Sequence, residues 1–339
     1  MSKSKINLGK SKISQEQHKT MIAQDQDKTT IAQDQRKTTM DQSMVYQFAV
    51  IGDPIEHSLS PVIHKPVLSQ FYDHFNYSRV LIKKGRLEEW IYKVKKEKIK
   101  GFNITMPHKV DIIPFLDEID YEAGIYNSVN TVVNEEGRLL GYNTDGRGFA
   151  LALETRGYHF KDSNILILGA GGVAATLTLK AVIEKAKSVT LLARNPEKAE
   201  ALIEQANNQS RDAENPTILQ ADRMEPEKLC KYAATADIVI NATPLGMKGI
   251  SSDFEDFRFL DNLHKDSLLC DLIYNPEKTT LLQEGESRGL RTMGGLDMLI
   301  NQGILADELF INKKFDYQKM YDLVKEYLQH DAKERVEDL

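Results

Sequence analysis

Short apolar blocks separated by polar turns begin near residue 46, and they predict a mixture of strands and helices. Apolar runs predict strands at 48–51, 77–82 and 101–105, followed by a hairpin made of 129–134 and 137–141. The spacing of apolar residues in Leu87–Lys98 is helical. Pro61 predicts another helix start, with Ser60 as its N-cap residue. The first part of the chain is therefore expected to form an α/β domain.

A more regular alternation of strands and helices begins at residue 164. Helices are predicted at 173–186 and 196–205, and strands at 164–169, 188–194, 218–220, 237–241, 267–272 and 290–292. This alternation is typical of a parallel sheet covered by helices on both faces. Two later helical segments, 298–309 and 317–328, follow the sheet. We expect a second α/β domain, with these C-terminal helices packing back on the first.

Residues 1–44 have a different composition from the rest of the chain. They carry a net charge of +3, seven Gln and no aromatic residue, and an imperfect nine-residue repeat starts at Lys19, Lys28 and Lys37. So little apolar surface cannot offset the entropy of ordering, which predicts a disordered tail. The alternative is a docking arm or a marginal helix that orders on a partner.

Composition excludes several classes of protein. With 44 Lys and Arg against 50 Asp and Glu, the net charge of −6 argues against nonspecific nucleic-acid binding. No apolar run approaches the ~20 residues of a membrane-spanning helix, and no secretory signal is visible. The two cysteines, Cys230 and Cys270, lack metal-ligand spacing. We therefore expect a soluble protein of the reducing cytoplasm, although one Cys–Cys bridge stays open.

A glycine-rich loop after the strand at 164–169 predicts a dinucleotide site. Gly169-Ala-Gly171-Gly172-Val-Ala174 matches the pattern GxGxxG/A and opens a helix, which is the context the motif requires. Gly169 permits the tight turn, Gly171 lets the backbone approach a pyrophosphate, and the small Ala174 allows close helix packing. The helix N-terminus offers free N–H groups to the phosphates.

The end of the next strand indicates which dinucleotide is bound. NAD sites usually place Asp or Glu there, whereas this chain has Arg194-Asn195. A guanidinium suits a 2′-phosphate because it forms charge-assisted, bidentate hydrogen bonds. NADP is therefore the predicted cofactor, and the alternative is that Arg194 is an ordinary surface arginine.

Polar clusters in the first domain indicate proton-transfer chemistry. Lys109 lies just past the strand at 101–105 and the break at Pro107, and Asp145 precedes the nucleotide half. Removing a hydride from a secondary alcohol requires a group that takes the hydroxyl proton, and a lysine with a lowered pKa can do so. Ser58 and Ser60 stand at a strand-to-helix turn, where two hydroxyls can bind a carboxylate. Taken singly, each has a structural alternative: a solvated lysine, a turn aspartate or a helix cap.

From residue 48 to about 328 the chain closely resembles the shikimate dehydrogenase family. The resemblance is carried by these motifs: Ser58-x-Ser60-Pro61, Asn103-x-Thr105-x-Pro107-x-Lys109, Val129-Asn130-Thr131, Asn143-Thr144-Asp145, the 169–172 loop, Asn241-Ala-Thr243-Pro-Leu-Gly246-Met247, Asp271-Leu-Ile-Tyr274-Asn-Pro276 and Gly294-Gly295-Leu296-x-Met298-Leu299-x-x-Gln302. It implies reversible reduction of 3-dehydroshikimate to shikimate with NADP, in the route to chorismate and aromatic amino acids.

The resemblance also implies a role for individual residues. Ser58, Ser60 and the nearby Tyr274 would bind the shikimate carboxylate, and Lys109 with Asp145 would form the catalytic pair. The ring hydroxyls would be bound by Asn103, Thr105, Asn130 and Gln302. The cofactor would be held by Gly169, Ala170, Gly171, Gly172, Val173, Arg194, Asn195, Thr243, Leu272 and Gly295.

Together these interpretations predict five segments. They are a disordered repeat tail (1–44), a substrate-binding catalytic domain (45–146), a Rossmann-type NADP-binding domain (147–294), C-terminal helices completing the substrate domain (295–330) and a polar tail (331–339). No metal is expected, because His57, His64 and His108 lack ligand spacing. The expected partner is a small-molecule substrate, without nucleic acid or membrane, and the protein is expected to be a monomer or homodimer.

Two alternatives to this function remain open at the level of the sequence. The first is a quinate or dual quinate/shikimate dehydrogenase using NAD. Quinate carries an extra hydroxyl, and a pocket discriminates a single added hydroxyl only weakly. The family often has Asn-Arg-Thr or Asn-Arg-Ser where this chain has Ala193-Arg194-Asn195. A non-catalytic NADP-binding regulator would be expected to lose Lys109 or Asp145, and both are present.

Overall fold

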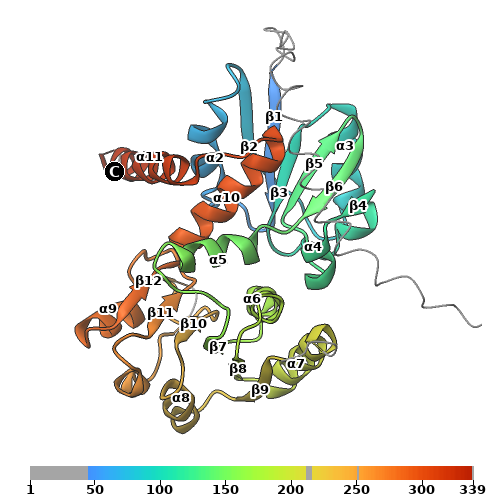
Figure 1. The fold of residues 1–339 in the computed structure, drawn as a ribbon. Helices are drawn as coiled ribbons and strands as arrows, with labels where there is room; N and C mark the ends of the chain where they lie inside the picture. Colours follow the sequence, from blue (N-terminus) through green and yellow to red (C-terminus); the bar gives the residue numbers. More distant parts are fainter. Residues whose placement is uncertain (1–44, 211–215, 250–251, 338–339) are drawn as a thin grey trace, which may run out of the picture. The chain divides into compact units, whose positions relative to one another are not determined.

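The computed structural model describes residues 45–210, 216–249 and 252–337, all within the unit Val45–Leu339. The predicted repeat tail of residues 1–44 lies outside the described residues. In the described part, two separate sheets of six strands are present, each with helices on its faces (Figure 1). The expected α/β class with two sheets is confirmed.

The first sheet is mixed. Its strands are β1 (Tyr46–Gly52), β2 (Phe75–Leu81), β3 (Gly101–Ile104), β4 (Glu118–Ile119), β5 (Thr131–Glu135) and β6 (Arg138–Tyr142). They are ordered β2-β1-β3-β5-β6-β4. β1 is parallel to both of its neighbours, whereas β5 is antiparallel to β3 and β6. The predicted hairpin is thus present as β5 and β6.

Helices cover both faces of this sheet. The elements are α2 (Ser60–Leu68), α3 (Leu87–Lys96), α4 (Tyr121–Tyr126) and the short 3-10 helix η1 (Ile113–Phe115). On one face, Trp90 and Val94 of α3 pack against Phe102 of β3. On the other face, Leu68 of α2 packs against Phe48 of β1. These apolar contacts form the core around the first sheet, in the first half of the described chain.

The second sheet is parallel throughout, as the regular alternation predicts. Its strands are β7 (Asn164–Leu168), β8 (Ser188–Ala193), β9 (Ile218–Arg223), β10 (Ile238–Asn241), β11 (Leu268–Asp271) and β12 (Arg291–Met293). They are ordered β12-β11-β10-β7-β8-β9. The chain crosses from β8 and β9 on one side to β10 on the other, so the carboxyl end of β7 is a switch point, where such sheets bind ligands.

The second sheet is also covered on both faces. The elements are α6 (Gly172–Ile183), α7 (Pro196–Ser210), α8 (Pro226–Ala233), η2 (Arg258–Asn262) and α9 (Thr280–Ser287). Leu177 of α6 and Leu202 of α7 belong to one apolar cluster, and Leu229 of α8 and Leu281 of α9 belong to the other. This arrangement sets the N-terminus of α6 directly after β7.

Three further helices are α5 (Asp145–Glu154), α10 (Gly295–Ile311) and α11 (Tyr317–Glu337). α5 and α10 lie side by side (Figure 1), and Asn301 of α10 donates a hydrogen bond to the carbonyl of Gly148. Phe310 of α10 packs on Phe48 of β1, and Val324 of α11 packs with Ile63 of α2. The prediction that the C-terminal helices pack back on the first half is confirmed.

Two local predictions are wrong. α2 begins at Ser60, and its N-cap residue is Leu59. No side chain caps this helix, and the hydroxyl of Ser60 instead accepts a hydrogen bond from the hydroxyl of Ser58 (3.1 Å). α11 continues to Glu337 instead of ending at residue 328. Its last turns carry Lys, Glu, Arg and Ala, which favour helix without an apolar face, so the loss of apolar spacing was not an end signal.

Candidate active site

A cavity of about 260 Å³ lies at the carboxyl end of the second sheet. It is lined by the predicted residues Gly169, Ala170, Gly171, Arg194, Asn195 and Thr243, together with Ala193, Lys198, Met224, Ala242, Pro244 and Leu245. Gly172, Val173, Leu272 and Gly295 lie outside this lining. Six of the ten predicted cofactor-binding residues thus line one cavity, and their role in cofactor binding stays a prediction.

The glycine loop is built for close approach of a ligand. Gly169 has φ +112°, a conformation that favours glycine, and its N–H donates to the carbonyl of Leu192 (2.7 Å). A Cβ added to Gly171 or Gly172 would meet no atom within 4 Å. Gly171 is the N-cap residue of α6 and provides no side-chain cap. The first N–H groups of α6 are therefore available to an anion.

Two cations stand beside this loop at the start of α7. Arg194 is exposed and makes no hydrogen bond or ion pair with any described residue. Asn195 accepts a hydrogen bond from the Lys198 N–H (3.4 Å) and so caps α7. Lys198 lines the same cavity, one helical turn after Arg194, and the sequence analysis missed it. A lysine in the first turn of a helix opposes the helix dipole, which is the signal that could have found it.

The opposite wall of the cavity is fixed by a buried hydrogen-bond network. Oδ1 of Asn241 accepts from the N–H (3.0 Å) and the hydroxyl (2.6 Å) of Thr243. Nδ2 of Asn241 donates to Oδ1 of Asp271 (3.0 Å), and Thr279 donates to Oδ2 (2.6 Å). Burial raises the pKa of Asp271 to about 6. Thr243 is thus held in one orientation at the end of β10.

Leu272 and Gly295 meet at the edge of this sheet. The N–H of Gly295 donates to the carbonyl of Ile273 (3.2 Å), and an added Cβ on Gly295 would lie 2.2 Å from the Leu272 carbonyl oxygen. Only glycine fits there. Tyr274 follows and is 36% exposed. No hydrogen bond in the described part of the chain joins Tyr274 to Ser58 or Ser60.

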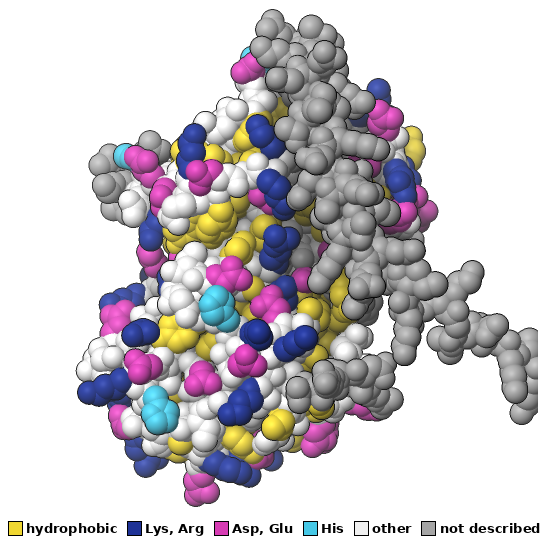
Figure 2. All heavy atoms as spheres, in the orientation of Figure 1, with side chains coloured by type: hydrophobic (Ala, Val, Ile, Leu, Met, Phe, Trp, Pro, Cys, Tyr) yellow, Lys and Arg dark blue, Asp and Glu magenta, His cyan; other side chains and the backbone are white. Residues whose placement is uncertain are grey.

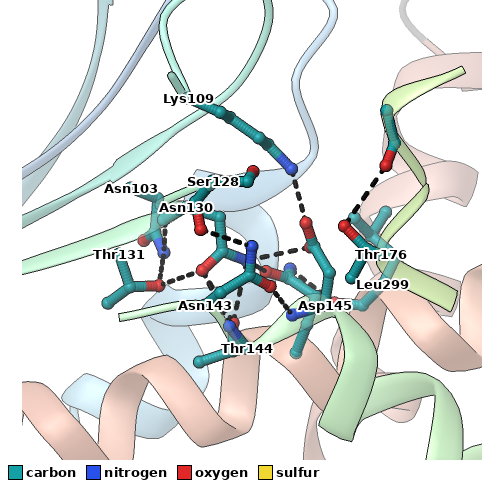
Figure 3. A network of polar contacts seen from close by, with 12 residues as sticks. Asn103, Lys109, Ser128, Asn130, Thr131, Asn143, Thr144, Asp145, Thr176 and Leu299 are labelled. Carbon is teal, nitrogen blue, oxygen red and sulfur yellow. Dashed lines mark hydrogen bonds and ion pairs between the residues drawn. The ribbon is translucent and has the colours of Figure 1, made fainter. Parts of the chain in front are cut away.

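In the first half, the structure brings Lys109 and Asp145 together. Nζ of Lys109 donates to Oδ2 of Asp145 at 2.6 Å (Figure 3). The two side chains are 25% and 11% exposed. Asp145 is the first residue of α5, where the helix dipole favours a negative charge. The pair is therefore accessible and held close.

Asn130 orients the carboxylate of that pair. Its Nδ2 donates to Oδ1 of Asp145 (2.9 Å), to Thr144 (2.9 Å) and to Oε1 of Gln302 (3.4 Å). Its Oδ1 accepts from the N–H of Thr144 (2.9 Å), and Asn143 accepts from the N–H of Asp145 (3.0 Å). Figure 3 shows Asn130, Asn143, Thr144 and Asp145 gathered below Lys109. The predicted residues Asn130, Asp145 and Gln302 thus form one network.

Asn103 connects this network to a residue that the sequence analysis missed. Its Nδ2 donates to the hydroxyl of Thr131 (3.0 Å), and its Oδ1 accepts from the hydroxyl of Tyr77 (2.6 Å). Burial raises the pKa of Tyr77 well above its usual value, while a hydrogen bond with Ser60 opposes the rise. The ring of Tyr77 stacks on His64, with centroids 4.6 Å apart. Tyr77 looks like an ordinary strand residue in the sequence.

The two predicted carboxylate-binding serines face one another. The hydroxyl of Ser58 donates to that of Ser60 at 3.1 Å. Thr105 lies just after β3, where its N–H donates to the carbonyl of Ile51 (2.9 Å). Its methyl group fills the space beside Gly52, where an added Cβ would lie 2.4 Å away. Thr105 is therefore placed by packing, without a hydrogen bond to the other predicted residues.

The described ranges also bear on other kinds of site. They hold no group of three His, Cys, Asp or Glu able to bind a metal, and no helix there could cross a membrane. On the face that Figure 2 shows, basic and acidic side chains are interspersed and form no continuous basic patch among the described residues.

The cavity fits a phosphorylated dinucleotide. The space above Gly171 and Gly172 is open to a pyrophosphate, and Arg194 and Lys198 offer positive charge at the end of β8. A glycine loop at the switch point of a parallel sheet, together with a separate Lys–Asp pair, defines a dinucleotide-dependent oxidoreductase.

Comparison with known proteins identifies the family. Residues 50–132 match the shikimate dehydrogenase substrate binding domain, and residues 150–251 match shikimate / quinate 5-dehydrogenase. The chain is 36% identical over 273 residues to the shikimate dehydrogenase (NADP(+)) of Nitrosopumilus maritimus, covering 80% of this chain and 96% of that protein. The chain belongs to the shikimate dehydrogenase family.

Solved structures agree with this assignment. Shikimate 5-dehydrogenase of Listeria monocytogenes, in complex with shikimate and NAD, has a TM-score of 0.75 and 30% identity, covering 84% of this chain and 96% of that chain. The Thermus thermophilus enzyme, in complex with NADP(H) and shikimate, has a TM-score of 0.70 and 31% identity, covering 83% and 99%. Both structures therefore share the arrangement of the two sheets.

Proposed function

We propose that the protein is an NADP-dependent shikimate dehydrogenase, which reduces 3-dehydroshikimate reversibly to shikimate in the route to chorismate and aromatic amino acids. The observation that carries the proposal is the 2.6 Å contact between Lys109 and Asp145, with Asn130 on the second carboxylate oxygen. The relatives named above are NADP(+) enzymes or bind shikimate.

Lys109 is the proton-transfer group. In the oxidising direction its neutral amine takes the proton of the substrate hydroxyl, and in the reducing direction its ammonium returns a proton to the carbonyl oxygen. The bound nicotinamide exchanges the hydride with the substrate carbon. Asp145 accepts the hydrogen bond from Lys109 and holds the amine in position, while Asn130 fixes the carboxylate.

The remaining residues divide between the two ligands. Ser58, Ser60 and Tyr274 bind the substrate carboxylate, and Asn103, Thr105, Asn130 and Gln302 bind its hydroxyl groups. The phosphates are held by the loop from Gly169 to Val173, the 2′-phosphate by Arg194 and Asn195, and the nicotinamide by Thr243, Leu272 and Gly295. Residues 45–146 and 295–330 then form the substrate domain, and residues 147–294 form the NADP-binding domain.

The cellular setting follows from the same proposal. The protein acts in the cytoplasm on a small molecule, as a monomer or homodimer, without nucleic acid or a membrane. The interspersed basic and acidic side chains on the face that Figure 2 shows support the part of this proposal that excludes nucleic acid.

Initial rates of nicotinamide reduction test the function, with shikimate or quinate crossed against NADP or NAD. We expect fast turnover with shikimate and NADP. Comparable rates with quinate or NAD would place the protein in the dual-specificity branch. Cofactor binding without turnover in any combination would support the non-catalytic regulator.

The assignment of the cofactor is tested by Arg194→Glu. Reversing this charge at a 2′-phosphate is expected to raise the KM for NADP by about 10- to 100-fold, because charge-assisted hydrogen bonds contribute about 1.5–3 kcal/mol. The KM for shikimate should not change. An equal KM for NADP in the variant and the wild type would show that Arg194 does not bind the 2′-phosphate.

A further inference from the structure

Arg79 lies on the substrate side of the first sheet. It stands on β2, two residues after Tyr77, so both side chains point to the same face. In the sheet register, Arg79 and Asn103 both lie opposite Val50 of β1. Their Cα atoms are therefore two strand spacings apart, roughly 10 Å. A ligand of that length on this face reaches both residues.

Arg79 also contacts the serine loop directly. Its Nε donates to the carbonyl oxygen of Ser58 at 2.8 Å. The hydroxyl of the same serine lies 3.1 Å from that of Ser60. The guanidinium is thus fixed beside the two hydroxyls at the start of α2.

The charge of Arg79 has no carboxylate partner in the part of the chain that the structure describes. Arg79 is exposed, and no described carboxylate forms an ion pair with it. By contrast, Lys109 is paired with Asp145. An arginine bound only through Nε keeps both terminal nitrogens free, in the planar geometry that matches a carboxylate.

We propose that Arg79 is a specificity-determining residue whose guanidinium binds the carboxylate of the substrate beside Ser58 and Ser60. The inference rests on the proposed function, which supplies a monocarboxylate substrate. Two serine hydroxyls can donate hydrogen bonds to that carboxylate but cannot neutralise its charge. Arg79 supplies the positive charge and holds the Ser58 backbone in place.

Steady-state kinetics with NADP tests the proposal on Arg79→Gln and Arg79→Lys, using shikimate and its uncharged methyl ester. We expect Arg79→Gln to raise the KM for shikimate by about 10- to 100-fold, with kcat and the KM for NADP nearly unchanged. The KM for the ester should change little. Arg79→Lys, which keeps the charge, should recover part of the loss.

Arg86→Gln is the matched control, because Arg86 is an exposed arginine of the same half that pairs with Glu89 instead of the serine loop. It should leave both KM values unchanged. An unchanged KM for shikimate in Arg79→Gln, or an equal rise for acid and ester, would overturn the role of Arg79.

Failure of the proposed function is recognised separately, as absence of turnover by the wild type. In that case the role of Arg79 is tested by measuring the binding of shikimate calorimetrically. Equal affinities of the wild type and Arg79→Gln would overturn the inference.

Discussion

Two acid–base pairs in this molecule have nearly the same geometry and very different surroundings. Lys109 and Asp145 are 2.6 Å apart, with side chains 25% and 11% exposed. His64 and Asp307 are 2.7 Å apart, with side chains 1% and 0% exposed. The first pair can reach a substrate, whereas the second is closed between α2 and α10. Contact distance alone therefore does not identify a catalytic pair.

The two pairs also differ in whether all of their polar atoms form hydrogen bonds. Both oxygens of Asp145 accept hydrogen bonds, from Lys109 and Asn130. In the buried pair, Nε2 of His64 and Oδ2 of Asp307 have no partner. Burial raises the pKa of Asp307 to about 6, and His64 opposes the rise. The accessible pair is thus expected to affect turnover, and the fully buried pair is expected to affect stability.

The largest expected effect is on turnover, through Lys109. Lys109→Met removes the proton-transfer group and should lower kcat by about 10²- to 10⁴-fold, with little change in the KM for shikimate. Lys109→Arg keeps the ion pair but cannot release a proton, so it should be almost as slow. Rates measured with saturating NADP distinguish these cases. Near-normal turnover of either variant would show that another group transfers the proton of the substrate hydroxyl.

The next effect is on stability, through the buried pair. Asp307→Val leaves His64 buried without its partner and should lower the free energy of unfolding in urea by about 3 kcal/mol. The double variant His64→Leu/Asp307→Val should recover most of that loss, because neither polar group remains. The kcat of the folded protein should change little. A fall in kcat resembling that of Lys109→Met would show that both pairs serve catalysis.

A buried carboxyl without a cation gives the third comparison. Burial raises the pKa of Asp271 to about 6 from 3.8. Its protonated form favours the folded state, so this stabilisation is complete below about pH 4 and is lost as the pH rises through 6. Relative to Asp271→Asn, the wild type should lose about 2–3 kcal/mol of unfolding free energy between pH 4 and 7. Parallel pH profiles of the two proteins would contradict this assignment.

The smallest effect concerns a lysine that forms ion pairs with two partly exposed glutamates. Lys180 of α6 contacts Glu122 of α4 at 2.7 Å and Glu184 at 2.9 Å, with side chains 7%, 23% and 30% exposed. Lys180→Met keeps the apolar stem and should cost about 1 kcal/mol of unfolding free energy, less at high salt. A loss of unfolding free energy as large as that of Asp307→Val would mean that the burial of an ion pair does not determine how much stability is lost when it is broken.

The sequence predicted the elements with strong local patterns. The six parallel strands, the glycine loop and the polar residues at strand ends all have local signals, so Gly169, Asn103 and Asp145 were found. Helices α5, α8 and α9 were not predicted, because their apolar faces are short. The chemistry of a lysine and an aspartate at the domain junction is enough to predict the pair of Lys109 and Asp145 from the sequence.

The parts that could not be predicted depend on contacts between distant segments. His64 and Asp307 are 243 residues apart in the chain, and neither carries a local signal. Tyr77 and Arg79 lie two residues apart on an ordinary strand, and only the three-dimensional structure shows that they lie close to Asn103 and Ser58. Burial and register are three-dimensional properties, which one sequence does not display.

The join between β11 and α10 has a consequence for how this chain can change over generations. Gly295 leaves no space for a Cβ beside Leu272, and the same helix carries Gln302 to Asn130. Any nucleotide change in the first two positions of a glycine codon replaces the residue. Every such change at position 295 therefore places a Cβ against the Leu272 backbone, so this join accepts no single-step replacement unless the backbone beside β11 moves.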